Sequence, residues 1–176
     1  MFVALVFFLY CLSFGGVYTL VPDFSKHLEI QNKGLFFSIS VGVSTLSRIW
    51  AGKFSDQKGR IPVLKIGLLL NVLSLVLLAN TTSALGFSLS AMVYGLSTGI
   101  NSPVIFAWVT DRSLSHLKGR AFSTLLLAME IGIGLGGILA SLIYQNSAIN
   151  LSLSFYFMAF TSVLALLFLT FKKSNW

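Results

Sequence analysis

The densest group of charged side chains lies in nine residues, from Gly52 to Arg60, between two long apolar segments. The carboxylate of Asp56 can accept hydrogen bonds at the positive end of a helix, and the guanidinium of Arg60 offers a forked pair of donors to another carboxylate. Gly59 permits a tight turn, and Gly52 is expected to let the end of a helix pack closely. These residue types predict a charge network that joins helix ends.

A second acid, Glu130, lies inside a long apolar segment. If that segment is a membrane helix that begins near Gly119, about 11 residues place Glu130 roughly 15 Å deep, near the bilayer centre. A charge at that depth costs about 3 kcal/mol. Desolvation disfavours the ionised carboxyl, so we expect Glu130 to hold a proton when unpaired and to release it when water enters. A proton-coupled carrier needs this chemistry, and a neutral acid hydrogen-bonded between helices is the structural alternative.

Two polar stripes follow helical spacing, which places their members on one helix face. Lipid offers these groups no partner, so we expect both stripes to point toward a cavity or another helix. The stripes are Tyr94, Thr98, Asn101, Ile105 and Trp108, and then Ser123, Glu130, Gly134, Gly137 and Ser141.

Small residues in the same two segments recur at the spacing of closely packed helices. Gly95 and Gly99 form one pair, and Gly132 and Gly136 form the other. Such pairs let helix backbones approach closely in lipid. The sequence predicts helix packing here, and a sliding contact in a moving transporter is the alternative.

Catalytic and metal-dependent chemistry has little support. Cys11 lies within the first apolar segment, and His27 and His116 lie in different connectors. No other Cys or carboxylate stands at ligand spacing from them, so we expect neither a metal site nor a cofactor. The chain also lacks the G-x-S-x-G, phosphate-loop and dinucleotide-binding motifs, and we do not predict an enzyme.

The composition explains where these residues must lie. The chain has 176 residues, of which 56% are hydrophobic and 10% are charged, against roughly 25% charged in a soluble domain. Spanning a bilayer takes roughly 20 apolar residues in a helix, because lipid leaves backbone groups without partners. We predict an all-α integral membrane protein with a single domain over residues 1–176, whose six transmembrane helices cover residues 2–22, 34–51, 62–79, 85–110, 119–144 and 151–171.

The three prolines are expected to mark these helices. Pro22 should end the first, and Pro62 should start the third, where its missing N–H would be unpaired anyway. Pro103 lies within the fourth helix and should kink it.

The net charge of +7 would suggest nucleic acid in a soluble protein, but basic residues gather on the cytoplasmic side of membrane proteins. We therefore expect no nucleic-acid partner. Six helices place both termini on one face, together with the connectors after the second and fourth helices. That face has ten basic residues and the other has two, Lys26 and Lys33, which predicts cytoplasmic termini; the ten are Arg48, Lys53, Lys58, Arg60, Lys65, Arg112, Lys118, Arg120, Lys172 and Lys173.

The pattern Gly52-x-x-x-Asp56-x-x-Gly59-Arg60 closely resembles the signature loop of the major facilitator superfamily, which joins the second and third helices of each six-helix half. In that family the aspartate bonds a helix N-terminus of the opposite half. The arginine pairs with an acid after the half's fourth helix, where this chain has Asp111. Arg48 either snorkels to the headgroups or joins this network, and we favour the network.

The resemblance covers the whole chain and favours the C-terminal half of such a transporter. Phe36-Phe37, Ser47-Arg48 and the segment from Ala128 to Gly137 are similar to helices of drug- and sugar-efflux members. Basic residues that the family often has are absent at Gln57 and Ile61, and a Gly-Pro of the efflux motif is replaced by Gly136-Gly137. Antiport and drug specificity are therefore open.

Two functions remain as hypotheses. The first is half of a secondary active transporter that moves a small organic solute by alternating access, with possible proton-coupled efflux. It would lie in the cell membrane, the inner membrane in a bacterium, and pair with a second six-helix half or a second copy. The second is a six-helix membrane interaction protein, or a degenerate remnant, without transport of its own. The transport pathway is expected to involve Tyr10, Tyr18, Tyr94, Thr98, Asn101 and Glu130, and Phe14 beside them.

Overall fold

A computed structural model describes residues 2–171, and this part of the chain is entirely helical outside its short connectors. Lys172 and Lys173, which contribute to the predicted charge asymmetry, lie outside the described residues. The elements are α1 (Phe2–His27), α2 (Leu35–Lys58), α3 (Arg60–Asn80), α4 (Ala84–Arg112), the 3₁₀ turn η1 (Ser115–Leu117), α5 (Lys118–Tyr144) and α6 (Ala148–Phe171).

The first helix is longer than the sequence predicted. Pro22 lies inside α1, which continues to His27. The extension is held by packing, because Phe24 is buried against the rings of Phe87 and Phe155, at centroid distances of 5.9 and 5.4 Å. The expectation that Pro22 ends this helix is therefore wrong.

The segment from Gly52 to Arg60 is also more helical than expected. Residues up to Lys58 belong to α2, α3 begins at Arg60, and Pro62 is its third residue. The break between them is a single residue, Gly59, whose φ of +88° is a conformation that side chains with a Cβ resist. The predicted nine-residue loop is thus one glycine hinge between two charged helix ends.

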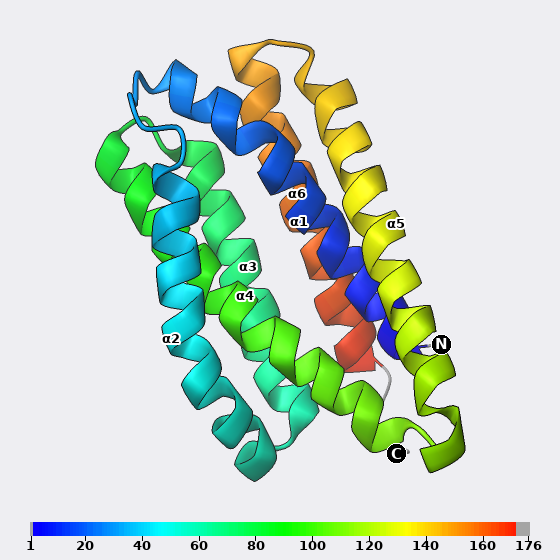
Figure 1. The fold of residues 1–176 in the computed structure, drawn as a ribbon. Helices are drawn as coiled ribbons and strands as arrows, with labels where there is room; N and C mark the ends of the chain where they lie inside the picture. Colours follow the sequence, from blue (N-terminus) through cyan, green and yellow to red (C-terminus); the bar gives the residue numbers. More distant parts are fainter. Residues whose placement is uncertain (1, 172–176) are drawn as a thin grey trace.

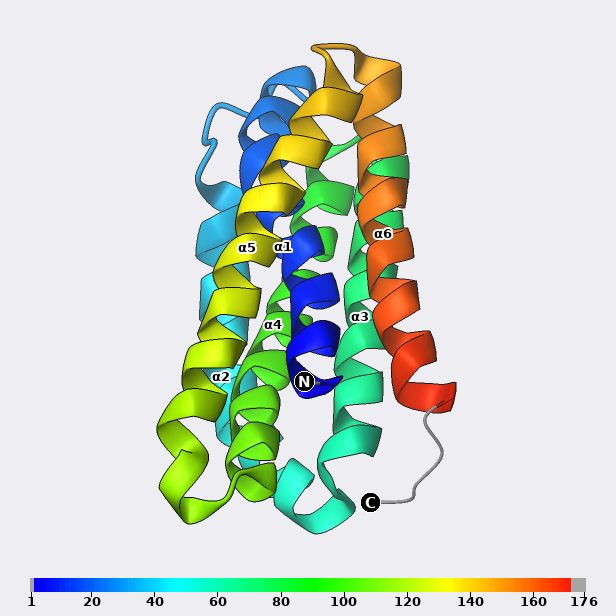
Figure 2. The same ribbon diagram turned by 90° about the vertical axis from the view of Figure 1, so that its right-hand side faces the viewer.

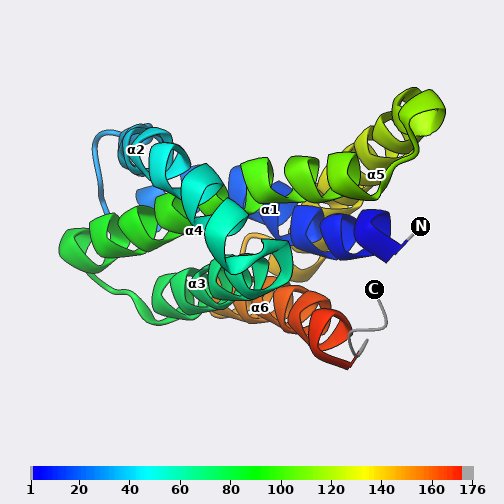
Figure 3. The same cartoon turned by 90° about the horizontal axis from the view of Figure 1, so that it is seen from below.

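The helices form a bundle with two unlike sides. The main pairs in contact are α1 with α5 and α6, α4 with α2 and α3, and α3 with α6. Seen from below, α3 and α6 follow one side, and α2, α4, α1 and α5 follow the other (Figure 3). The start of α1 and the end of α6 point toward the same end of the bundle as the α2–α3 and α4–α5 connections (Figures 1 and 2).

Glycines set the closest helix contacts, as the sequence predicted. A Cβ on Gly136 of α5 would lie 2.1 Å from the carbonyl oxygen of Leu12, and one on Gly15 of α1 would lie 2.0 Å from that of Ile133. Gly95 and Gly99 similarly bring α4 against the backbone of α2. Without a hydrophobic drive between helices in lipid, such close backbone contact is a main source of helix association.

Buried polar side chains add a second kind of contact. Asn71 of α3 is fully buried and donates hydrogen bonds of 2.8 Å to the hydroxyls of Ser13 on α1 and Ser162 on α6. One amide therefore joins three helices in the bundle interior.

Five of the described helices, all but α4, are long and apolar enough to cross a membrane. The fourth helix has the length of a span, at 29 residues, but holds many small and polar residues. Its polar side chains are mostly inside the bundle, where Ser97 and Asn101 are fully buried. Packing against α2 and α3, rather than apolar character alone, thus decides the place of α4.

Candidate functional site

At the α2–α3 hinge, Arg60 pairs with the two aspartates that the sequence analysis identified, Asp56 and Asp111. Its Nε donates to Oδ2 of Asp111 at 2.8 Å, and its Nη1 donates to Asp56 and, at 2.6 Å, to the hydroxyl of Ser55. The Arg60 side chain is 19% exposed, whereas the side chains of both aspartates are more than half exposed. This cluster therefore ties the end of α4 to the hinge, and Ser55 is a member that the sequence analysis did not identify.

Two other residues of the expected network lie apart from it. Among residues 2–171, Arg48 forms no salt bridge with Asp56 or Asp111, and Arg60 pairs with both. Gly52 does not pack closely as expected, since a Cβ built there would have no neighbouring atom within 4 Å. Arg48 is exposed, and Gly52 is half-buried.

The polar stripe of α4 points into the bundle. Tyr94, Thr98 and Asn101 are all buried. The amide of Asn101 donates to Ser97 at 3.1 Å, but its Oδ1 and the hydroxyl of Tyr94 have no hydrogen-bond partner among the described residues. The Oδ1 of Asn101 lies on the side of α3, where a Cβ on Gly67 would be 2.2 Å from it. Buried polar atoms are costly when unpaired, so each of the two atoms favours a polar partner or water.

Residues of α1 approach this stripe from the opposite side. Tyr10 is buried, its hydroxyl also has no hydrogen-bond partner within the described chain, and it interacts electrostatically with Asn101, Tyr94 and Tyr18. The structure thus brings four of the predicted pathway residues into one region between α1 and α4.

A cluster of three aromatic side chains, Phe14, Tyr18 and Phe37, adjoins this region. Tyr18 is 46% exposed, stacks on Phe14 at a centroid distance of 4.5 Å and lies tilted against Phe37 at 4.8 Å. Phe14 also lies 6.4 Å from the ring of Tyr94. The contribution of Phe37 from α2 was not identified in the sequence, where only the Phe36-Phe37 pair was noted.

The stripe of α5 behaves differently, because it faces outward. Glu130 is exposed at the surface of the bundle, as are Gly134 and Ser141. Glu130 interacts electrostatically with Cys11, and Arg48 does so with Tyr10, the preceding residue of α1.

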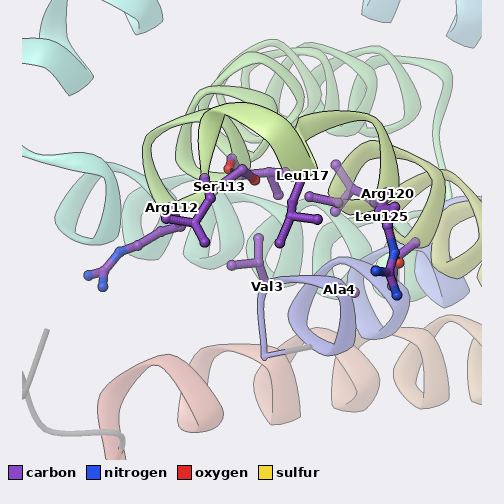
Figure 4. A pocket seen from close by; sticks show the side chains of 11 residues that line it. Val3, Ala4, Arg112, Ser113, Leu117, Arg120 and Leu125 are labelled. Carbon is purple, nitrogen blue, oxygen red and sulfur yellow. Dashed lines mark hydrogen bonds between the residues drawn. The ribbon is translucent and has the colours of Figure 1, made fainter.

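A separate pocket of about 420 Å³ lies between the first turn of α1, the end of α4, η1 and the start of α5. Its centre is apolar, with Val3, Ala4 and Leu117, and Arg112 and Arg120 lie at opposite sides (Figure 4). It shares no lining residue with the predicted pathway.

In residues 2–171 no group of three or more His, Cys, Asp or Glu could hold a metal ion.

Comparison with known proteins gives a family match over nearly the whole chain. The sequence profile of the Major Facilitator Superfamily matches residues 3–175. An uncharacterized MFS-type transporter of Enterobacter sp. (strain 638) is 30% identical over 141 residues, which cover 78% of this chain and 36% of that protein. The uncharacterized MFS-type transporter YcaD of Salmonella arizonae has the same identity and coverage. The chain thus spans 36% of the length of these relatives.

Two solved structures share the fold. The human organic anion transporter MFSD10 superimposes with a TM-score of 0.76 at 22% identity, over 96% of this chain and 45% of that one. A peptide transporter, POT, gives a TM-score of 0.77 at 21% identity, over 96% of this chain and 36% of that one. The bundle therefore has the fold of roughly half of a larger transporter.

Proposed function

The chain belongs to the major facilitator superfamily, and we propose that it forms one six-helix half of a secondary transporter for a small organic solute. In such transporters substrate binds near the bilayer midplane between two helix bundles that rock against each other. All six helices would span the cell membrane, with both termini in the cytoplasm, and a companion bundle would cover the side formed by α2, α4, α1 and α5. The match to 36% of the relatives' length supports this arrangement.

The observation that carries the proposal is where the polar groups lie. Glu130, Arg48 and Tyr18 are exposed on the helices of one side, and polar atoms of Tyr10, Tyr94 and Asn101 are buried without a hydrogen-bond partner among the described residues. A bundle that only filled space would gain nothing from these groups in lipid. Together they supply hydrogen bonds, charge and aromatic surface to a solute held between two bundles.

Glu130 is the residue that we assign to proton coupling. It is an acid on a helix face that lipid or a companion bundle must cover, so its ionised form needs water or a cation. Opening of the pathway to water would favour release of the proton, and closing would favour its return. Alternating exposure of one carboxyl would in this way link proton movement to the rocking of the bundles.

The solute class is argued from the site and from structural neighbours. Aromatic rings, hydroxyls and one charge of each sign suit an organic solute with both apolar and polar parts. The two neighbours transport an organic anion and peptides, according to their names. We therefore propose organic anions and short peptides as the first solutes to test.

The test is solute-driven proton movement in proteoliposomes. The chain is reconstituted together with the companion bundle that purifies with it from native membranes, and a pH-sensitive dye inside reports protons as organic anions or di- and tripeptides are added outside. The native chain should couple at least one solute to proton movement, and Glu130→Gln should abolish this coupling. Glu29→Gln is the matched control, because Glu29 is exposed in the α1–α2 connector, outside the helices.

The same experiment separates the alternative function. A membrane interaction protein without transport would assemble with its partner but leave the dye unchanged for every solute. Coupling that survives Glu130→Gln with an unaltered pH dependence would overturn the role of Glu130.

A further inference from the structure

The pocket of about 420 Å³ between the ends of α1, α4 and α5 has no part in the proposed transport pathway. Its walls come from the first turn of α1, the end of α4, η1 and the start of α5. These segments lie at one end of the bundle, where the α4–α5 connection turns back (Figures 1 and 2). In the orientation that we propose for the transporter, this end meets the cytoplasmic surface of the membrane.

The charged residues of the pocket lie nearer to the helix ends than its buried apolar residues. Arg112 is the last residue of α4, and Arg120 is the third residue of α5. Val109 and Leu125 also line the pocket and are buried, about 4.5 and 7.5 Å further along the same two helices. Positive charge at the membrane surface with apolar side chains below it matches the order of groups in a phospholipid.

The arginines are the groups of this pocket that can donate hydrogen bonds to an anion. The hydroxyl of Ser113 already donates to the carbonyl oxygen of Val109 at 2.6 Å, and that of Thr124 donates to the carbonyl oxygen of Arg120 at 2.9 Å. A guanidinium has several N–H donors and can bind a phosphate with two of them at once. Arg120 forms no salt bridge within the described part of the chain, and none of the described lining residues is an Asp or Glu.

We propose that this pocket binds an anionic phospholipid, whose phosphate is held by Arg120 and Arg112. The first carbons of an acyl chain lie against Val3, Ala4 and Leu117, which occupy the space between the two arginines (Figure 4). Basic pockets between membrane helices on the cytoplasmic side are suited to anionic lipid headgroups. The inference rests on the proposed function only for the orientation of the bundle, and the site is separate from the solute pathway.

A bound lipid has a structural consequence. One molecule in this pocket would contact α1, α4 and α5 at the same end of the bundle. A ligand that binds only the folded protein stabilises it, so the anionic lipid should raise the temperature of unfolding in proportion to the logarithm of its concentration.

The test is lipid binding measured by native mass spectrometry. The chain is purified from native membranes with any companion bundle that stays attached, and it is delipidated in detergent. It is then titrated with phosphatidylglycerol, with phosphatidylcholine that has the same acyl chains, and with glycerol 3-phosphate. Phosphatidylglycerol should bind at least about tenfold more tightly than phosphatidylcholine, because only the former brings a net negative charge to the arginines. Glycerol 3-phosphate, which has the phosphate without the chains, should bind far more weakly.

Two variants separate the charge of the pocket from its shape. Arg120→Gln removes a donor and should weaken phosphatidylglycerol binding by about tenfold or more while leaving phosphatidylcholine unchanged. Ala121→Phe keeps every charge but fills the pocket, since Ala121 is a half-buried lining residue. It should weaken the binding of both lipids. Thermal unfolding without added lipid checks that each variant is folded.

Lys118→Gln is the matched control. It removes one positive charge from the same turn of α5, but Lys118 is exposed and does not line the pocket. Its affinity for phosphatidylglycerol should stay within about threefold of the native value, because an isolated surface charge contributes little.

Three results would overturn the proposal: equal binding of the two phospholipids, phosphatidylglycerol binding that survives both pocket variants, or an equal loss in Lys118→Gln. Glycerol 3-phosphate that binds as tightly as phosphatidylglycerol would show that the pocket takes a soluble anion, and the lipid assignment would be wrong. The binding measurement involves no solute movement, so its failure would leave the proposed transport function standing. Lipid binding without solute-coupled proton movement would in turn leave the lipid site standing.

Discussion

Replacing Gly136 by alanine tests how α1 and α5 are held together. The added Cβ would lie 2.1 Å from the carbonyl oxygen of Leu12, a backbone atom that cannot rotate away. Ordinary contact begins at 3.4 Å, so the two helices would have to separate locally by about 1.3 Å. This separation would loosen the contacts that Gly15 and Gly132 make across the same interface.

The magnitude follows from the two opposing effects of the methyl group. Overpacking of a well-packed interior costs about 1–3 kcal/mol. Alanine is the better helix former by up to about 1 kcal/mol, and this gain is common to every glycine of the helix. Gly134→Ala is the matched control because its Cβ meets nothing within 4 Å. We therefore expect Gly136→Ala to be about 1–3 kcal/mol less stable than Gly134→Ala.

Gly132 supplies an intermediate case on the same helix. Its Cβ would lie 2.8 Å from the carbonyl oxygen of Phe8 and 2.9 Å from the Cβ of Cys11. Smaller displacements relieve these contacts, so Gly132→Ala should fall between the other two variants.

The assay uses the chain's one cysteine, Cys11, which is 3% exposed and lies at this interface. A thiol-reactive dye in detergent reports unfolding as Cys11 becomes accessible during heating. The midpoint should fall in the order Gly134→Ala, Gly132→Ala, Gly136→Ala. Equal midpoints for Gly134→Ala and Gly136→Ala would refute the reasoning that close backbone approach holds α1 against α5.

Two further predictions concern buried and exposed polar contacts. Asn71→Leu should change the free energy of unfolding by less than about 1 kcal/mol, because hydrogen bonds between membrane helices average about 0.6 kcal/mol each and the variant also removes a buried, unpaired Oδ1. Denaturation in mixed micelles measures this change. A loss of several kcal/mol would show that the hydrogen bonds to Ser13 and Ser162 are far stronger. Asp111→Asn should lower the free energy of unfolding by only about 0.2–1 kcal/mol, because the Asp111 side chain is 51% exposed and its charge is screened. Asp56→Asn should have a similar effect. A double-mutant cycle with Arg60→Gln measures each coupling energy, and a value near zero for Asp111 would mean that this ion pair does not stabilise the hinge.

Prediction from the sequence succeeded where a single residue type decides the local backbone conformation or the closeness of two helices. Gly59 makes the hinge because its φ of +88° is open to glycine, and the glycine pairs mark close contacts because any side chain would collide with a backbone. Helix ends were less predictable. α1 passes through Pro22, because Phe24 beyond it gains burial that the local proline signal does not contain.

The direction of a helix face was decided only by the tertiary structure. The stripes of α4 and α5 have the same spacing in the sequence, yet the first is buried and the second is exposed. Spacing fixes which side chains share a face, but the neighbouring helices fix which face is covered. The same holds for Arg48, for which the sequence left snorkelling and the charge network open, whereas the structure pairs Arg60 with both aspartates.

The sequence by itself thus determined the helical membrane architecture, a turn at Gly59 and the family, because apolar length, glycine geometry and a motif of fixed spacing are properties of short segments. Only the tertiary structure showed that Tyr10 and Asn101, 91 positions apart, meet between α1 and α4, and that Glu130 and Arg48 are exposed at the surface of the bundle. The physical reason is that burial and electrostatic partnership depend on distances between helices, and the sequence of one helix does not contain them.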